Sequence, residues 1–330
     1  MNYYKSTNIA SLALRSSFEK IFKPYRVFGG TTEGVYKTDT EAEITVLDGL
    51  VEDPASGVSS ISESEYQAAL HPSTGDGQSE SGGGEFSIEA EPSNILPLYK
   101  LYFIDPLTGT TKLTFTASSI DGSVDLEQAV DLQEVDAPNL TELHATYGVN
   151  GEFLVALCPS LATINMPKLA TVGGRLHFEQ NPVLLTANFP KLASIDFFDL
   201  DTCLIFPSLS LPLLETVGGI FECYANPEMT VLDLPSLVSV GAAMTCYDNS
   251  SLTTVNLPVW VPLNGAEIHF HNGALSVESV DGILARCVAN PDFVSGTITL
   301  QGGTNSAPSS VAPGSDYDVL IDRGVTVTVN

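Results

Sequence analysis

A repeat of 22 or 23 residues runs through the middle of the chain and restricts its possible folds more than any other feature. Prolines recur at this spacing, and apolar residues recur at fixed positions around them. The prolines are Pro167, Pro190, Pro212, Pro235 and Pro258, and two residues after them stand Leu169, Leu192, Leu214, Leu237 and Trp260. Such a period predicts a solenoid, in which each turn of the chain buries its apolar face only by stacking on its neighbours.

A second column of the repeat predicts a ladder of side chains inside the stack. Its members are Cys158, Asn181, Cys203, Asn226, Asn249 and Asn272. The first five follow an apolar-x-apolar-x-x run, whereas the run before the sixth is displaced by one residue. We expect a short strand to direct two side chains inward, and the ladder residue to lie at the turn that follows. There an Asn side chain can pair backbone groups that would otherwise be buried without hydrogen bonds.

The repeat defines the largest of five predicted segments, a solenoid over residues 124–275, whose first copy is weaker than the others. Two apolar runs flank the turn-like sequence Asp105-Pro-Leu-Thr-Gly109, which predicts a β-hairpin cap over residues 96–123. The stretch 73–95 is rich in Gly, Ser and acidic residues, which is typical of a linker. Residues 276–330 are predicted to form a C-terminal helix and a β-rich cap, because apolar side chains from 277 to 287 share one helix face.

Residues 1–72 are predicted to form a small helical anchoring module. Apolar residues between positions 10 and 22 fit one helix face, and Pro24 would end that helix. Two capping-box patterns, Thr38 with Glu41 and Ser62 with Glu65, predict two further helices.

The distribution of charge favours some partners and excludes others. The chain has 40 acidic and 13 basic residues, and phosphate binding needs clustered Lys and Arg, so we expect no nucleic-acid partner. No apolar run is long enough to span a membrane, and no export signal is recognised. The first 37 residues nevertheless carry six basic residues against two acidic ones. We interpret Lys5, Arg15, Lys20, Lys23 and Arg26 as an anchoring arm; the alternative is an ordinary solvated surface.

The repeat resembles the BspA-type leucine-rich repeat over about residues 124–275. The resemblance is carried by Cys158-Pro-Ser-Leu-Ala-Thr-Ile-Asn-Met-Pro-Lys-Leu-Ala-Thr-Val-Gly-Gly and by Leu176-His-Phe-Glu-Gln-Asn181. The third copy departs from the pattern with Leu204-Ile-Phe-Pro-Ser-Leu209. The resemblance implies a leucine-rich-repeat-like solenoid with one β-strand per turn, serving as a surface adhesin or binding module. It implies no catalytic residues.

Both ends of the chain are similar to segments of bacteriophage proteins. Thr297-Ile-Thr-Leu-Gln-Gly-Gly and Arg323-Gly-Val-Thr-Val-Thr-Val-Asn330 resemble the C-terminal ends of phage-encoded repeat proteins, and residues 38–70 resemble short segments of phage structural proteins. This implies a head or tail decoration or fibre protein of the virion, attached to other virion proteins by its N-terminal module. The alternative is a bacterial cell-surface adhesin, which an export signal or sorting motif would favour.

Alternation along the predicted strands places polar and aromatic side chains on the outer face of the sheet. They are His177, Glu179, Asp199, Asp201, Glu222, Tyr224, Thr245, Tyr247, Glu267, His269 and His271. Repeat proteins often bind partners on such a surface, and Tyr among acidic residues favours a host protein or glycan. The alternative is a solvated face with no partner. His269 and His271 share this face, but no third ligand is assured, so we predict neither a metal site nor a cofactor.

No motif of an enzyme active site occurs, and we predict no catalytic residues. The sequence contains no HExxH, P-loop or GxSxG pattern. Its five cysteines form no CxxC pair, and we expect free thiols buried as small apolar groups. Asn249 begins a glycosylation sequon, but its predicted place inside the stack leaves no room for a glycan. Association with further copies of the chain is one more option for a partner.

Overall fold

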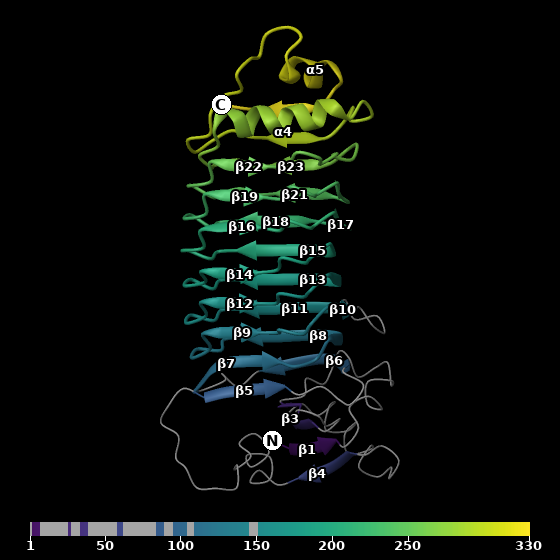
Figure 1. Ribbon diagram of the computed structural model, residues 1–330, viewed down its shortest axis with the longest axis vertical. Helices are drawn as coiled ribbons and strands as arrows, with labels where there is room; N and C mark the ends of the chain where they lie inside the picture. The colour runs from purple at the N-terminus through teal and green to yellow at the C-terminus, as the bar shows by residue number, and fades with distance from the viewer. Residues whose placement is uncertain are drawn as a thin grey trace.

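The computed structural model describes residues 2–6, 26–27, 34–38, 58–61, 84–88, 95–103, 109–144 and 151–330. Its main body is a parallel β-solenoid whose turns stack along the long axis of the molecule (Figure 1). There are about 7 turns of about 23 residues each. The solenoid and the length of its turn, predicted from the spacing of the prolines, are therefore confirmed.

One long parallel sheet forms a wall of the solenoid along its whole length. Its 13 strands are β6 (Ile95–Phe103), β8 (Ser119–Glu127), β10 (Glu142–His144), β11 (Gly151–Ala156), β13 (Thr171–Glu179), β15 (Ser194–Asp201), β17 (Thr216–Val217), β18 (Phe221–Tyr224), β20 (Ser239–Val240), β21 (Ala243–Thr245), β23 (Glu267–His269), β24 (Thr297–Thr299) and β25 (Thr326–Thr328). Each strand pairs with the strand one turn away, so Phe153 lies opposite Leu176, and Leu176 lies opposite Phe198. Equivalent apolar residues thus form rows inside the stack.

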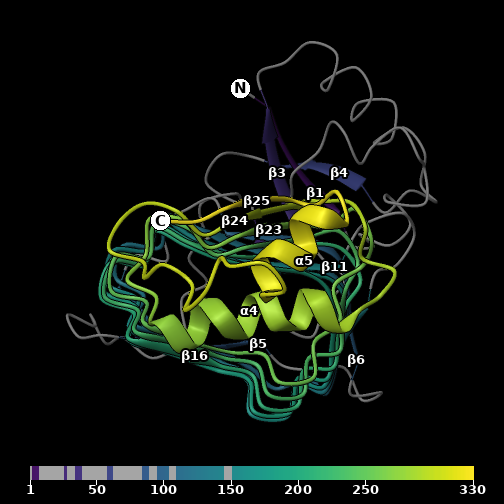
Figure 2. The same cartoon turned by 90° about the horizontal axis from the view of Figure 1, so that it is seen from above.

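Two shorter parallel sheets form a second wall. One contains β5 (Gly84–Ile88), β7 (Thr110–Phe115), β9 (Glu134–Asp136), β12 (Thr163–Asn165) and β14 (Thr186–Asn188), and the other contains β16 (Ser208–Ser210), β19 (Val231–Asp233) and β22 (Thr254–Asn256). Seen down the stack, the successive turns lie almost over one another (Figure 2). This superposition is what brings residues 22 or 23 apart in the chain into contact.

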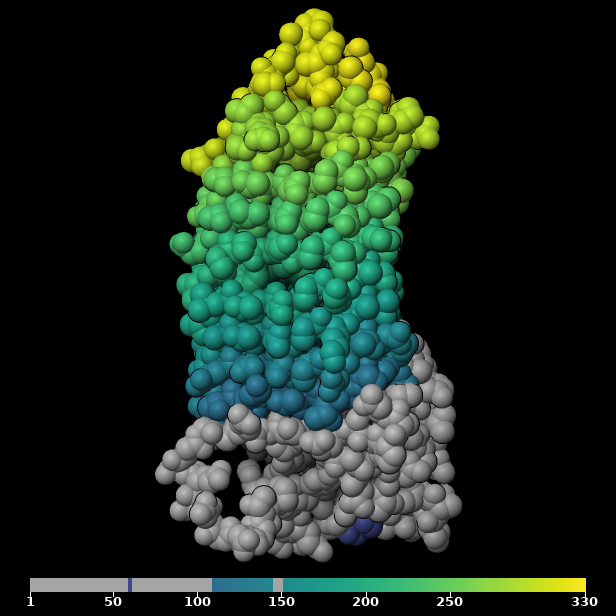
Figure 3. Space-filling view, viewed as in Figure 1, coloured from purple at the N-terminus to yellow at the C-terminus, as the bar shows by residue number. Residues whose placement is uncertain are grey.

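The hydrophobic core lies between these walls and is continuous from Leu113 to Val327. The apolar residues that follow the repeat prolines are all buried, and Trp260 is the largest of them. Stacked ring pairs, such as Phe198 with Phe221 at a centroid distance of 5.1 Å, join one turn to the next. Figure 3 shows the turns as layers packed on one another. No single turn could bury this surface alone, which is why the repeats fold together.

The predicted ladder is present in its first five members, which are completely buried. Nδ2 of Asn181 donates to the carbonyl of Val155 at 2.8 Å, and its Oδ1 accepts from the N–H of Cys158 at 3.1 Å. Asn226 repeats this pattern toward Leu200 and Cys203. Each ladder Asn therefore pairs backbone groups of the preceding turn that water cannot reach.

The sixth ladder residue was predicted in the wrong register. Asn272 is exposed, because the turn before it is one residue longer: Met244 pairs with Ile268, which places Gly273 opposite Asn249. A Cβ at Gly273 would lie 2.9 Å from Oδ1 of Asn305. Asn305 itself takes over the ladder role, since its Nδ2 donates to the carbonyl of Phe270 and its Oδ1 accepts from the N–H of Leu275.

The residue before the ladder position has a left-handed backbone in each turn from Ala129, the equivalent position of the first repeat, to Gly273. These residues are Gln128, Leu157, Gln180, Thr202, Ala225, Asp248 and Asn272, with φ between 51° and 58°. Residues with a Cβ rarely adopt this conformation, which costs about 1–2 kcal/mol. Seven such residues in register show that the stacking of the turns imposes it.

Two helices lie at the C-terminal end of the stack (Figure 2). Helix α4 (Val277–Ala289) begins at Ser276, whose Oγ accepts from the N–H of Ser279, and it buries Val280, Ile283, Leu284 and Cys287. Helix α5 (Asp316–Asp322) begins at Ser315 in the same way. The helix predicted at the start of residues 276–330 is present, while β24 and β25 extend the long sheet.

Four short strands of the N-terminal part form a separate antiparallel sheet in the order β2 (Arg26–Val27), β3 (Gly34–Thr38), β1 (Asn2–Ser6) and β4 (Val58–Ile61). The helices predicted for residues 10–22, 42–50 and 66–70 lie outside the described residues. The helical anchoring module therefore stays a prediction.

The hairpin predicted within residues 96–123 is wrong. Its two strands lie in different walls, because β6 pairs with β8 whereas β7 pairs with β5 and β9. In a solenoid each strand pairs with the equivalent strand of the neighbouring solenoid turn, and not with the strand that follows it after a short loop. For the same reason part of the predicted linker is a strand: β5 lies within residues 73–95 and pairs in parallel with β7.

Candidate functional site

Ten of the eleven predicted residues, all except Glu267, lie in two parallel rows on the outer face of the long sheet. The first row contains His177, Asp199, Glu222, Thr245 and His269, which pair in that order across neighbouring strands. The second contains Glu179, Asp201 and Tyr224 in register, and stacking of rings continues it through Tyr247 and His271. Adjacent strands lie about 4.8 Å apart, so neighbours within a row are in contact.

This face is less exposed than the sequence predicted. Asp199 and Asp201 are each 3% exposed, and Thr245 is 9% exposed. Of the other eight predicted residues only Glu267 is exposed, and the remaining seven are half-buried. The reason is the ladder geometry itself, because the side chains of the turns above and below cover each residue from two sides. Alternation predicts which side of a strand a residue faces, but it does not predict how deeply its neighbours cover it.

One end of the two rows is aromatic. The ring centroids of Tyr224 and Tyr247 lie 4.9 Å apart, and those of Tyr247 and His271 lie 4.8 Å apart, with nearly parallel planes. Burial is the main cause that raises the pKa of both Tyr hydroxyls and lowers the pKa of His271. Nδ1 of His271 is buried with no hydrogen-bond partner among the described residues. The three rings are therefore held in fixed positions and are uncharged at neutral pH.

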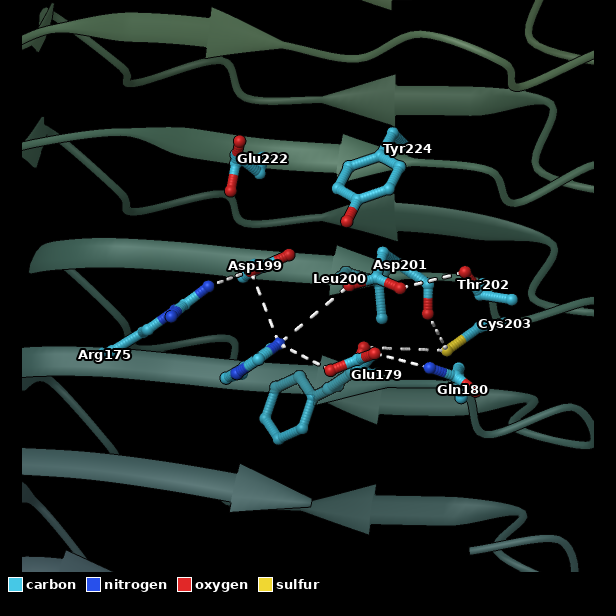
Figure 4. A network of polar contacts seen from close by, with 12 residues as sticks. Arg175, Glu179, Gln180, Asp199, Leu200, Asp201, Thr202, Cys203, Glu222 and Tyr224 are labelled. Atoms are coloured by element: carbon cyan, nitrogen blue, oxygen red, sulfur yellow. Dashed lines mark hydrogen bonds and ion pairs between the residues drawn. The ribbon is translucent and has the colours of Figure 1, made fainter. Parts of the chain in front are cut away.

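The other end of the rows is an ionic cluster around His177. Figure 4 labels four other members of this cluster, Arg175, Glu179, Asp199 and Asp201. Nε2 of His177 faces three carboxylate oxygens, at 3.5 Å from Glu179 Oε2, 3.5 Å from Asp199 Oδ2 and 3.9 Å from Asp201 Oδ2. Its Nδ1 lies 3.7 Å from Oε1 of Glu152. Arg175 forms an ion pair with Asp199.

Burial and charge act against each other inside this cluster. Burial alone would lower the pKa of His177, but the contact with Glu152 and the charge of Asp199 outweigh it, and the pKa is raised. Burial raises the pKa of Asp201 to about 6, although the hydroxyl of Thr202 donates a hydrogen bond to it at 2.9 Å. Asp199 keeps one buried oxygen, Oδ1, without a hydrogen-bond partner among the described residues.

The sequence predicts four members of this cluster as surface residues, but it does not predict that they contact one another. Glu152 and Arg175 were not among the predicted residues at all. The signal lies in His177-x-Glu179 on one turn and Asp199-x-Asp201 on the next, because a spacing of 22 residues places the two pairs side by side. Conversely, His269 and His271, which the sequence places on one face, meet edge to face at a centroid distance of 6.1 Å.

The predicted anchoring arm is described only in part. Lys5 lies on β1 and Arg26 on β2, and both lie opposite Val35 of the strand between them. The other three residues of the arm, Arg15, Lys20 and Lys23, lie outside the described residues.

The five cysteines are free and buried, as predicted. Burial raises the pKa of Cys158 to about 11 and the pKa values of Cys203 and Cys287 to about 12. A thiolate is the reactive form of cysteine, so none of these three is suited to act as a nucleophile near neutral pH.

No protein-family model, curated protein or solved structure matches the chain. Neither α4 nor α5, the helices of the described part, is long and apolar enough to cross a membrane. The sequence, the fold and the two rows of the long sheet are therefore the features from which a function can be inferred.

Proposed function

We propose that the chain is a non-enzymatic structural protein of a phage virion, a decoration or fibre component, whose solenoid presents the outer face of the long sheet to a partner. The observation that carries the proposal is the stack of rings formed by Tyr224, Tyr247 and His271, which continues the row of Glu179 and Asp201 on the outer face of the long sheet. The proposal includes the leucine-rich-repeat-like class of the solenoid and the virion origin, both of which rest on the sequence resemblances.

The geometry of this face suits recognition. Rings that are already stacked lose little conformational entropy when a partner binds, and this preorganisation favours affinity. Phenol hydroxyls and carboxylates along the same rows provide hydrogen-bond donors and acceptors at the repeat distance of the strands. A host-surface glycan or protein is therefore the class of partner that we propose for the face.

Binding by the face can be tested with paired variants. Tyr247→Ala removes the central ring of the stack, and Val238→Ala shortens an exposed side chain that belongs to neither row. We expect labelled wild-type protein and Val238→Ala to bind host cells equally, and Tyr247→Ala to lose most of that binding. If Tyr247→Ala binds as well as the wild type while remaining folded, this face is not the binding surface.

The virion location is tested separately. Mass spectrometry of purified particles should detect the protein at a fixed copy number, and treatment with salt should weaken attachment if the basic arm contributes, since exposed charges are screened over about 8–10 Å. Deletion of residues 1–37 should release the protein from the particle. Absence of the protein from washed particles would contradict the virion location and favour the alternative, a bacterial cell-surface adhesin, which fractionation of host cells would then detect in the envelope.

A further inference from the structure

We propose that His177, Glu179 and Asp201 form a binding site for a divalent transition-metal ion, with Zn²⁺ as the preferred ion, on the outer face of the long sheet. One nitrogen of His177 and one carboxylate oxygen each from the other two residues all lie within 4.8 Å of one another. An imidazole with two carboxylates is a ligand set typical of zinc. The inference does not depend on the proposed function.

The distances in the cluster fit metal ligands better than they fit hydrogen bonds. The oxygens of Glu179 and Asp201 lie 3.5 and 3.9 Å from Nε2 of His177, beyond the range of about 2.7–3.2 Å for a hydrogen bond. Zn²⁺ binds N and O ligands at about 2.0–2.2 Å, so two ligands of a tetrahedral ion are separated by about 3.4 Å. Small rotations of the two acidic side chains would complete this geometry.

The charge of the cluster favours a cation. Four carboxylates, those of Glu152, Glu179, Asp199 and Asp201, surround one imidazole and one guanidinium. Even with His177 protonated the cluster is negative, although two of its carboxylates belong to residues that are only 3% exposed. Burying uncompensated charge is costly, and a bound divalent ion would remove that cost.

A second, independent observation points the same way. Oδ1 of Asp199 is buried and has no hydrogen-bond partner among the described residues, while Oδ2 of the same carboxylate faces His177 Nε2 at 3.5 Å. Arg175 accounts for Oδ2 alone. A buried carboxylate oxygen without a partner requires an explanation, and a cation or a water molecule bound beside it supplies one.

The surroundings also orient the proposed ligands. Nδ1 of His177 faces Glu152 at 3.7 Å, which favours the tautomer that leaves Nε2 free to bind a metal. The hydroxyl of Thr202 donates to Oδ1 of Asp201 at 2.9 Å, leaving Oδ2 toward His177. Mutation of residues that orient metal ligands in this way commonly lowers the metal affinity by about 10–100-fold.

The test is a calorimetric titration of the full chain, made without a histidine tag, with ZnCl₂ in buffer containing excess Mg²⁺. We expect one Zn²⁺ per chain in the wild type. His177→Gln and Glu179→Gln should abolish detectable binding, and Asp199→Asn should weaken it by roughly 10–100-fold. The matched control is His269→Gln, because His269 also lies on this face beside a carboxylate, 3.8 Å from Glu267, but outside the proposed site. The Zn²⁺ affinity of His269→Gln should equal that of the wild type.

Co²⁺ provides a second measurement, which reports the coordination number of the bound ion. Its visible absorption should show the intense bands of a four-coordinate site in the wild type and in His269→Gln, and these bands should be absent in Glu179→Gln. Circular dichroism confirms that each variant is folded. The proposal would be overturned if the wild type bound no Zn²⁺ or if Mg²⁺ displaced the bound Zn²⁺. Equal Zn²⁺ affinities of the wild type and Glu179→Gln would also overturn it.

Discussion

Replacement of Asn226 by Ala tests the role of the ladder in holding the turns together. The side chain is completely buried. Its Nδ2 donates to the carbonyls of Leu200 and Tyr224, both at 3.0 Å, and its Oδ1 accepts from the N–H of Cys203 at 2.9 Å. Asn226→Ala leaves the N–H of Cys203 and the carbonyl of Leu200 without this partner. Each buried group left unpaired costs about 1–3 kcal/mol, so we expect the free energy of unfolding to fall by about 2–6 kcal/mol.

Two variants serve as references for this experiment. Asn226→Cys should lower the free energy of unfolding less than Asn226→Ala does, because cysteine already occupies two ladder positions. The Sγ atoms of Cys158 and Cys203 lie 3.8 and 3.9 Å from backbone carbonyls of the preceding turn, as the ladder Asn side chains do with theirs. Asn272→Gly keeps the left-handed backbone at an exposed position and should change stability by less than about 0.5 kcal/mol.

Urea denaturation, followed by circular dichroism and by the fluorescence of the single tryptophan, Trp260, measures these differences. Coincident transitions by the two probes show that unfolding is two-state and that a free energy can be extracted. Equal losses for Asn226→Ala and Asn272→Gly would refute the view that the buried ladder, and not asparagine at turns in general, stabilises the stack.

Three further predictions follow from burial. The five buried thiols should not react with a disulfide reagent at pH 8 in the native protein, and all five should react after denaturation. Leu209→Ala, in the core, should cost about 2–5 kcal/mol in urea denaturation, whereas Leu204→Ala, at a side chain that is 46% exposed, should cost less than about 0.5 kcal/mol. The pKa of His271 is lowered in the folded state, so the folded state is more stable when His271 is neutral than when it is protonated. Its imidazole should therefore titrate below the usual 6.5 in an NMR experiment, and its contribution to stability should decrease as the pH falls below that value.

The long-range pairing of the strands could not be predicted from local patterns. The apolar runs on either side of residues 105–109 look like the two arms of a hairpin, but residues 99–103 belong to β6 and residues 112–115 to β7, which lie in different walls. A local pattern indicates that a strand forms and which side of it is apolar. Its partner is decided by the stacking of whole turns.

The repeat in the sequence determined most of this protein by itself: a solenoid, a turn of about 23 residues, the buried leucines, and the Asn and Cys ladder as far as Asn249. These follow from residue type and spacing, because apolar positions that recur in register are buried only when successive turns stack on one another. The tertiary structure alone decided how the outer face is used. It buried Asp199 and Asp201, stacked Tyr224 on Tyr247, and brought His177 against carboxylates of three strands. The physical reason is that burial and ionic contact depend on what lies one turn above and below, about 4.8 Å away in space but 22 or more residues away in the chain.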